Sequence, residues 1–129
     1  MAQQVRGDSR KTIAQFAAAH PEVTCDVVLV DGAHTKEVAL SDLRQFHKLA
    51  RRGGETRLVA DDMDNPEVAA AWDIAVAEGL IVEPQLVVDN DVADSGRDMG
   101  FQCLVGSEGL LGFAWYAPGA SMAHPGRSS

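Results

Sequence analysis

Acidic residues follow two apolar segments of this sequence and could form one polar site. Asp31 ends the apolar run over residues 27–30, and Asp61 and Asp62 follow the run over 58–60. Neighbouring parallel strands lie about 5 Å apart, so their carboxyl ends could gather three carboxylates around one point. Three hard oxygen ligands suit Mg²⁺ or Ca²⁺ better than Zn²⁺. The same acids could instead cap the following helices or face solvent, and spacing alone leaves both interpretations open.

A histidine follows the first of these acids by three residues and could act as a base. His34 lies on a predicted turn into a helix, and histidine readily exchanges a proton near neutral pH. A hydroxyl group bound in front of the same strand ends could lose its proton to this imidazole. A surface histidine without a chemical role fits the same position equally well.

Three residues near the amino terminus are suited to bind a polar group. Gly7, Asp8 and Ser9 open a predicted helix, and free N–H groups at a helix start attract polar and anionic ligands. An ordinary helix cap explains the same residues, because aspartate and serine are preferred there.

The elements that must position these residues alternate between helix and strand. Apolar residues at helical spacing, together with caps at Asp8 or Ser9, Thr35 and Asn65, predict helices over residues 9–19, 36–50 and 66–78. Apolar runs predict strands over residues 27–30, 58–60, 80–88, 101–105 and 110–116, with a polar loop over 89–100. This pattern predicts a parallel α/β sheet covered on both faces, in one unit over residues 1–117 with a disordered tail over 118–129. Such sheets bind ligands beyond the carboxyl ends of their strands.

Composition restricts the class of protein. The chain has 129 residues, 46% hydrophobic and 23% charged, as expected for one soluble globular domain. A net charge of -8 without a basic cluster argues against a nucleic-acid partner. No apolar run forms a signal peptide or reaches the ~20 residues of a membrane span, so we expect no membrane partner and a cytoplasmic location. Cys25 and Cys103 are expected to stay reduced.

The segment DVVLVDGAHTKEVALSDLRQFHKLARRGGETRLVADD, over residues 26–62, resembles class I S-adenosylmethionine-dependent methyltransferases. More narrowly, it resembles a group with an Asp-Gly-Asp-His signature, and metal-dependent O-methyltransferases related to catechol and macrolide-sugar enzymes. The resemblance covers about residues 5–105. It implies a truncated Rossmann-like three-layer sandwich that contains strands four to seven and the intervening helices, which is the carboxyl-terminal half of the family's domain.

The resemblance also implies a role for each candidate residue. Asp31, Asp61 and Asp62 match the acids that bind Mg²⁺ or another divalent cation, and the catalytic residues would be His34 as general base together with Asp31. The residues matching the S-adenosylmethionine contacts are Gly7, Asp8, Ser9, Asp31, Gly32 and Ala33. The expected reaction is in-line transfer of the sulfonium methyl group to an oxygen of a small hydroxylated molecule.

Several departures from the family pattern open a second hypothesis. Ala33 replaces the second acid of the signature, and the chain has neither a glycine-rich loop after a first strand nor an acid ending a second one. The isolated chain is therefore expected to be inactive and to bind the methyl donor weakly or not at all. The strand over residues 27–30 would keep an open edge that favours self-association or a complementing half-domain. The alternative function is a non-catalytic interaction module or a truncated gene product. A haloacid-dehalogenase phosphatase is excluded, because Leu29 stands where its aspartate nucleophile would be.

Overall fold

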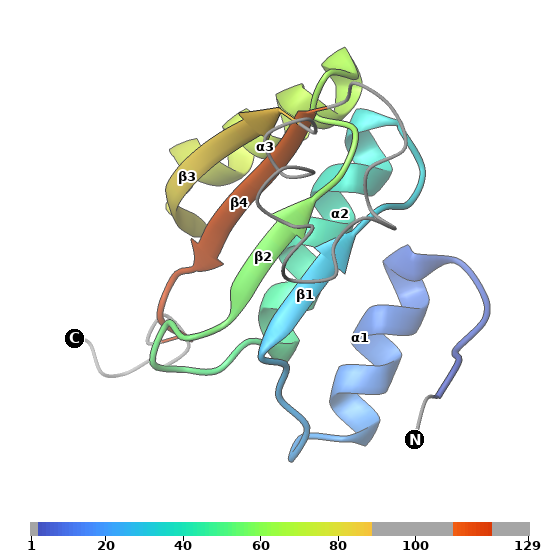
Figure 1. Cartoon of the computed structure of the whole chain (residues 1–129). Helices are drawn as coiled ribbons and strands as arrows, with labels where there is room; N and C mark the ends of the chain where they lie inside the picture. Colours follow the sequence, from blue (N-terminus) through green and yellow to red (C-terminus); the bar gives the residue numbers. More distant parts are fainter. Residues whose placement is uncertain (1–2, 89–109, 120–129) are drawn as a thin grey trace, which may run out of the picture.

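A computed structural model of the chain describes residues 3–88 and 110–119 (Figure 1). In chain order, the elements are α1 (Ser9–Ala19), β1 (Val27–Val30), α2 (Lys36–Phe46), a 3₁₀ turn η1 (His47–Leu49), β2 (Arg57–Ala60), α3 (Pro66–Ala77), β3 (Ile81–Val88) and β4 (Leu110–Tyr116). Apart from the end of α2, these boundaries agree with the predicted ones to within one residue. The predicted loop over 89–100, the strand over 101–105 and Cys103 lie outside the described residues.

The four strands form one mixed sheet in the order β1-β2-β4-β3. β1 and β2 pair in parallel, with Val28 opposite Leu58 and Val30 opposite Ala60, as the sequence predicts. β4 runs antiparallel to both of its neighbours, so the expectation of a wholly parallel sheet is wrong for this strand. The apolar pattern of a strand carries no information about its direction. The other three strands point the same way, and their carboxyl ends share one edge of the sheet.

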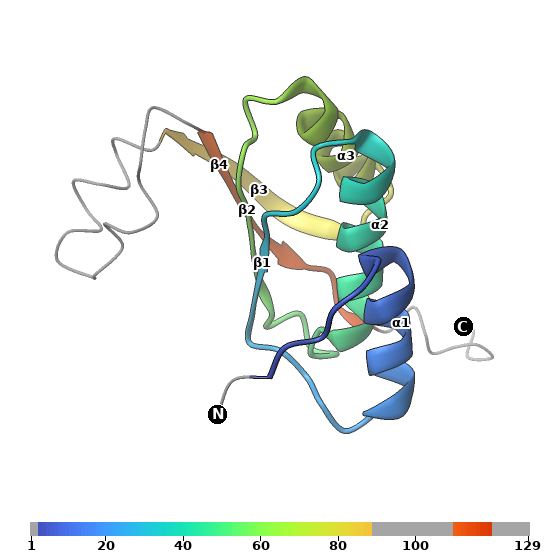
Figure 2. The same ribbon diagram turned by 90° about the vertical axis from the view of Figure 1, so that its right-hand side faces the viewer.

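All three helices lie on the same side of the sheet, where α2 and α3 cover its face and α1 packs against α2 beside β1 (Figures 1 and 2). Along β1, Val28 and Val30 are only 4% and 7% exposed beneath the helices, whereas Val27 and Leu29 are 61% and 50% exposed on the other face. The described residues form two layers, so the expected three-layer sandwich, with β1 covered on both faces, is wrong for them. A continuous apolar run shows that both faces of a strand suit burial, but it does not identify the segment that packs on the second face. One helix layer on a four-stranded sheet fits a truncated Rossmann-like fold.

Large buried side chains hold the helices on the sheet. Trp72 of α3 is 3% exposed and lies against Gly112 of β4, where an added Cβ would come within 3.0 Å of the indole. Glycine at this position therefore allows the close approach of helix and strand. Tyr116 at the end of β4 is 0% exposed, and its hydroxyl donates a 2.8 Å hydrogen bond to the Leu43 carbonyl of α2.

The helices begin at the caps that the sequence predicts. The side chains of Asp8, Thr35 and Asn65 accept hydrogen bonds from first-turn N–H groups of α1, α2 and α3. α2 ends at Phe46 rather than at residue 50, because the chain there tightens into η1. The turns after β1 and β2 are thus set by local side-chain contacts.

The first two residues of the expected tail are ordered. The Gly119 N–H donates a 2.9 Å hydrogen bond to the Arg52 carbonyl, and Pro118 lies against Gly54. These contacts correct the expected start of the tail, whose residues 120–129 fall outside the described part. Among the described helices, none has the length and apolar character that a membrane span requires.

Candidate active site

The carboxyl ends of β1 and β2 place the predicted acids next to each other. Asp31 follows β1, and Asp61 and Asp62 follow β2. The parallel pairing continues past the strands, since the Asp61 N–H donates a 3.0 Å hydrogen bond to the Val30 carbonyl. The strand ends therefore meet at one edge, where sheets of this kind bind ligands.

Two acids and a histidine converge at this edge. Asp31, His34 and Asp62 each offer one ligand atom, and the three atoms lie within 4.8 Å of one another. His34 Nε2 lies 2.8 Å from Asp62 Oδ2, close enough for a hydrogen bond and, with a protonated ring, an ion pair. The side chains of His34 and Asp62 are 50% and 38% exposed, so a bound molecule could reach them.

Asp61, the third acid of the predicted metal site, is not among these three residues. Its Oδ1 accepts a 2.8 Å hydrogen bond from the Asp62 N–H, so its carboxylate stabilises the turn after β2. Asp62 has a φ of +62°, a left-handed conformation that is uncommon outside glycine and often occurs at functional sites. The third member of the cluster is thus His34, whereas the sequence predicted the carboxylate of Asp61.

A cleft opens between α1 and β1, next to the same edge. It has a volume of about 490 Å³. Four of the residues predicted to contact the methyl donor line it, namely Gly7, Ser9, Asp31 and Gly32. Ala33 does not line this cleft, and lies instead with His34 at a pocket of about 10 Å³ between the two strand ends.

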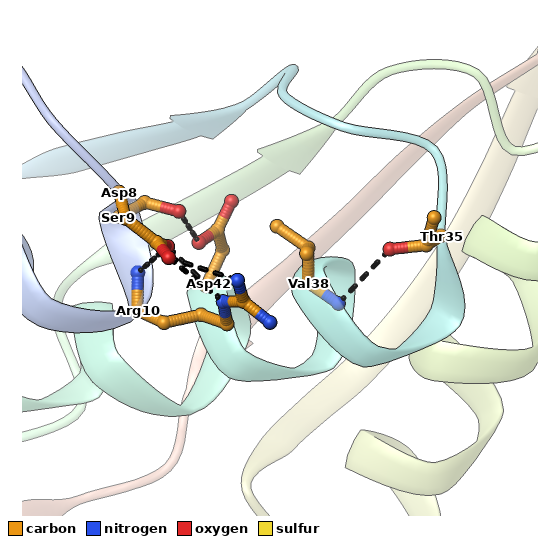
Figure 3. Close-up of polar contacts among 6 residues, drawn as sticks. All are labelled: Asp8, Ser9, Arg10, Thr35, Val38 and Asp42. Carbon is orange, nitrogen blue, oxygen red and sulfur yellow. Dashed lines mark hydrogen bonds and ion pairs between the residues drawn. The ribbon is translucent and has the colours of Figure 1, made fainter.

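Asp8 is the remaining predicted donor contact, and it acts as a helix cap. Its Oδ1 accepts a 3.0 Å hydrogen bond from the Arg10 N–H (Figure 3). Hydrogen bonds from the Arg10 side chain and backbone lower the pKa of Asp8 to about 2. This residue does not line the cleft, so the cap interpretation describes it better than ligand contact does.

A buried carboxylate that the sequence did not predict lines the cleft as well. Asp42 of α2 is 6% exposed, and the Ser9 hydroxyl donates a 2.6 Å hydrogen bond to its Oδ1 (Figure 3). Its Oδ2 would lie 3.2 Å from a Cβ at Gly32, which leaves little room there for a side chain. Burial raises the pKa of Asp42, while the Ser9 hydrogen bond opposes the shift and the charge of Asp8 adds to it.

The helical spacing of α2 contains a signal that could have identified this residue. Asp42 falls three residues after Ala39 and immediately before Leu43, so it lies on the buried stripe of the helix. A carboxylate on such a stripe needs a hydrogen-bond partner. Its partner Ser9 is far away in sequence, however, and that contact has no local signal.

Comparison with known proteins links this region to methyl transfer. Residues 1–63, just under half of the 129-residue chain, match a family model described as a methyltransferase domain. No curated protein matches the chain significantly. The matched segment contains Ser9, Asp31, His34, Asp42 and Asp62. The match supports a methyltransferase domain, and with it the general use of S-adenosylmethionine, in the part of the chain that carries the candidate site.

Proposed function

We propose that the chain carries the acceptor-activating half of an S-adenosylmethionine-dependent methyltransferase that methylates a hydroxyl oxygen of a small molecule. The observation that carries this proposal is the convergence of Asp31, His34 and Asp62 beside the cleft between α1 and β1. Asp31 and Gly32 line both that cleft and the small pocket at His34. A donor in the cleft and an acceptor at His34 would therefore meet at Asp31, and methyl transfer depends chiefly on such positioning.

The residues of the cleft fit the nucleoside portion of the donor. Ile13 and Phe16 provide apolar surface for a purine ring. The Ser9 hydroxyl and the Asp31 carboxylate provide polar atoms for ribose or amino groups. When bound, S-adenosylmethionine supplies an electrophilic methyl group on a sulfonium.

The His34–Asp62 pair suits the activation of an acceptor hydroxyl. If His34 Nε2–H donates to the Asp62 carboxylate, at the observed 2.8 Å, the lone pair of Nδ1 is free to take the acceptor's proton. The carboxylate then stabilises the imidazolium that forms, as in other carboxylate–histidine pairs. Loss of the proton makes the acceptor oxygen a stronger nucleophile.

A divalent cation is a second way to activate the acceptor at the same residues. Asp31, His34 and Asp62 combine two carboxylates with one imidazole. This mixed ligand set suits Mn²⁺ or Zn²⁺, whereas Mg²⁺ prefers ligands that are all oxygen. The ion would hold and polarise the acceptor oxygen. His34 Nε2 cannot serve as a metal ligand and donate a proton to Asp62 at the same time. Addition of Mn²⁺ therefore separates the two schemes, because only a metal site broadens the resonances of all three side chains.

The proposal is tested by nuclear magnetic resonance of the ¹⁵N-labelled chain during titration with S-adenosylhomocysteine. We expect weak, saturable shifts at the amides of Ser9 and Gly32, with guanosine as the control that fails to reproduce them. Calorimetry should detect little affinity, because no glycine-rich loop joins a strand to a helix within residues 3–88 and 110–119. Micromolar binding would contradict a half-site, and shifts remote from the cleft would contradict the location of the donor.

The alternative function, a non-catalytic interaction module, is supported by the outer edge of β1, which pairs with no strand in the described part of the chain. It predicts that the chain binds a partner strand but gives no response to S-adenosylhomocysteine or Mn²⁺ at Asp31 and His34. A response at the strand edge alone would favour this alternative.

A further inference from the structure

One oxygen of the buried Asp42 carboxylate has no hydrogen-bond donor at the wall of the cleft. Among residues 3–88 and 110–119, the carboxylate accepts a hydrogen bond only from the Ser9 hydroxyl, which reaches Oδ1. Asp42 is 6% exposed and lines the cleft. Because a buried carboxylate oxygen has lost water, it gains stability from any donor that a bound molecule supplies.

This oxygen, Oδ2, lies where α1, α2 and the turn after β1 meet. It would come within 3.2 Å of a Cβ at Gly32, and Figure 3 shows the carboxylate beside Ser9 at the start of α1. Ile13 follows Ser9 by one helical turn, and Phe46 follows Asp42 by one turn, so each pair shares a helix face. All four side chains line the cleft. A buried acceptor therefore borders apolar walls.

We propose that Asp42 Oδ2 accepts a hydrogen bond from the exocyclic amino group of adenine, and so selects this base over purines with a carbonyl at the same position. The assignment rests on the proposed function, because that function places the nucleoside portion of the methyl donor in this cleft. A planar ring fits between apolar walls, and its exocyclic amino group is a hydrogen-bond donor. A carbonyl in its place would set two acceptors against each other.

The other polar groups of the donor fit Oδ2 less well. The two neighbouring ribose hydroxyls would bind a carboxylate best through both of its oxygens, but Oδ1 already accepts from Ser9. The ammonium group would lose its hydration beside Ile13 and Phe16. Removing a charged group from water costs more free energy than removing a neutral amino group. The neutral amino group of the base is therefore the better partner.

Three nucleosides test this assignment by nuclear magnetic resonance of the ¹³C,¹⁵N-labelled chain. Adenosine carries the amino group, purine riboside has a hydrogen in its place, and inosine has an oxygen. Adenosine should shift the carboxyl carbon of Asp42 and the amide of Gly32. Purine riboside and inosine should bind about tenfold or more weakly, because both leave Oδ2 without a donor.

The variant Asp42→Asn tests the carboxylate itself. It removes the charge and puts an NH₂ group at one of the two oxygen positions. The preference for adenosine over inosine should fall about threefold or more, because a charged acceptor bonds more strongly than a neutral one. Asp73→Asn makes the same change in net charge at an exposed position of α3 and should leave the preference unchanged. Thermal unfolding checks that both variants are folded.

Several results would overturn the assignment. Equal binding of the three nucleosides to the unmodified chain would do so without any variant, and so would a preference that Asp42→Asn leaves unchanged. Shifts with S-adenosylhomocysteine but with none of the nucleosides would show that the base is not the group recognised, without contradicting the proposed function. The absence of shifts with S-adenosylhomocysteine itself would contradict the proposed function and the assignment together.

Discussion

The hydrogen bond between Ser9 and Asp42 leads to a quantitative prediction for the variant Ser9→Ala. The Ser9 hydroxyl donates at 2.6 Å to a carboxylate whose residue is only 6% exposed. Hydrogen bonds to charged groups contribute about 1.5–3 kcal/mol to stability, against about 0.5–1.5 kcal/mol between neutral partners. Because Ser9→Ala leaves the ionised carboxylate without this donor, we expect the free energy of unfolding at neutral pH to fall by about 1.5–3 kcal/mol.

The pH dependence of this loss follows from the pKa of Asp42. Burial raises that pKa above its ordinary value of 3.8, so the folded chain holds the proton more tightly than the unfolded chain. The contribution of protonated Asp42 to the free energy of unfolding is therefore fully present below pH 3.8, and it is lost as the pH rises through the pKa of Asp42 in the folded chain. Since the Ser9 hydrogen bond lowers the pKa, its removal raises the pKa further. The cost of Ser9→Ala should therefore shrink to about 0.5–1.5 kcal/mol where Asp42 is protonated.

Urea unfolding at several pH values, followed by tryptophan fluorescence, to which buried Trp72 contributes, measures these free energies. Ser41→Ala in α2 is the matched control and should change stability by less than about 0.5 kcal/mol. In an Asp42→Asn background, Ser9→Ala should cost about 1 kcal/mol less than in the original chain. An equal cost of Ser9→Ala at acidic and neutral pH, or in both backgrounds, would refute the charge-assisted bond.

Three other predictions concern the proposed metal ligands and the packing. His34→Gln should weaken Mn²⁺ binding about tenfold or more, measured by paramagnetic broadening, whereas Asp61→Asn should leave it nearly unchanged. A larger effect of Asp61→Asn than of His34→Gln would instead support a site made of the three carboxylates. Tyr116→Phe should lower the free energy of urea unfolding by about 1–2 kcal/mol, because it leaves a buried carbonyl without its donor. Gly112→Ala should cost about 1–3 kcal/mol because the new Cβ would lie 3.0 Å from the buried indole. Gly53→Ala, which meets only a flexible glutamate side chain, is its control, and equal stability of the two glycine variants would show that the β4 contact is not tight.

Features encoded by neighbouring residues could be predicted from the sequence. The caps at Asp8, Thr35 and Asn65 determine where the helices begin, and the apolar runs locate β1 and β2. Parallel pairing of these two strands also follows from the helix between them. The position of the polar edge therefore follows from local sequence patterns alone.

Features that depend on tertiary contacts could not be predicted in the same way. Apolar residues on both faces of β1 suggested two covers, but the described helices provide only one. Asp61 and Asp62 are adjacent residues of the same type, so the sequence does not distinguish their roles. In the structure Asp62 has a left-handed backbone conformation and its carboxylate contacts His34, whereas the Asp61 carboxylate accepts a hydrogen bond from the Asp62 N–H. The Ser9–Asp42 contact joins two helices whose sequences give no indication of each other.

The proposed function depends on binding of the methyl donor in the cleft beside Asp31. Titration of the ¹⁵N-labelled chain with S-adenosylhomocysteine tests it most directly. Donor binding in this cleft predicts saturable shifts at residue 9 and Gly32 that Ser9→Ala weakens and that guanosine does not reproduce. Unchanged amides at both positions at millimolar ligand, in a chain whose tryptophan fluorescence shows that it is folded, would contradict donor binding there.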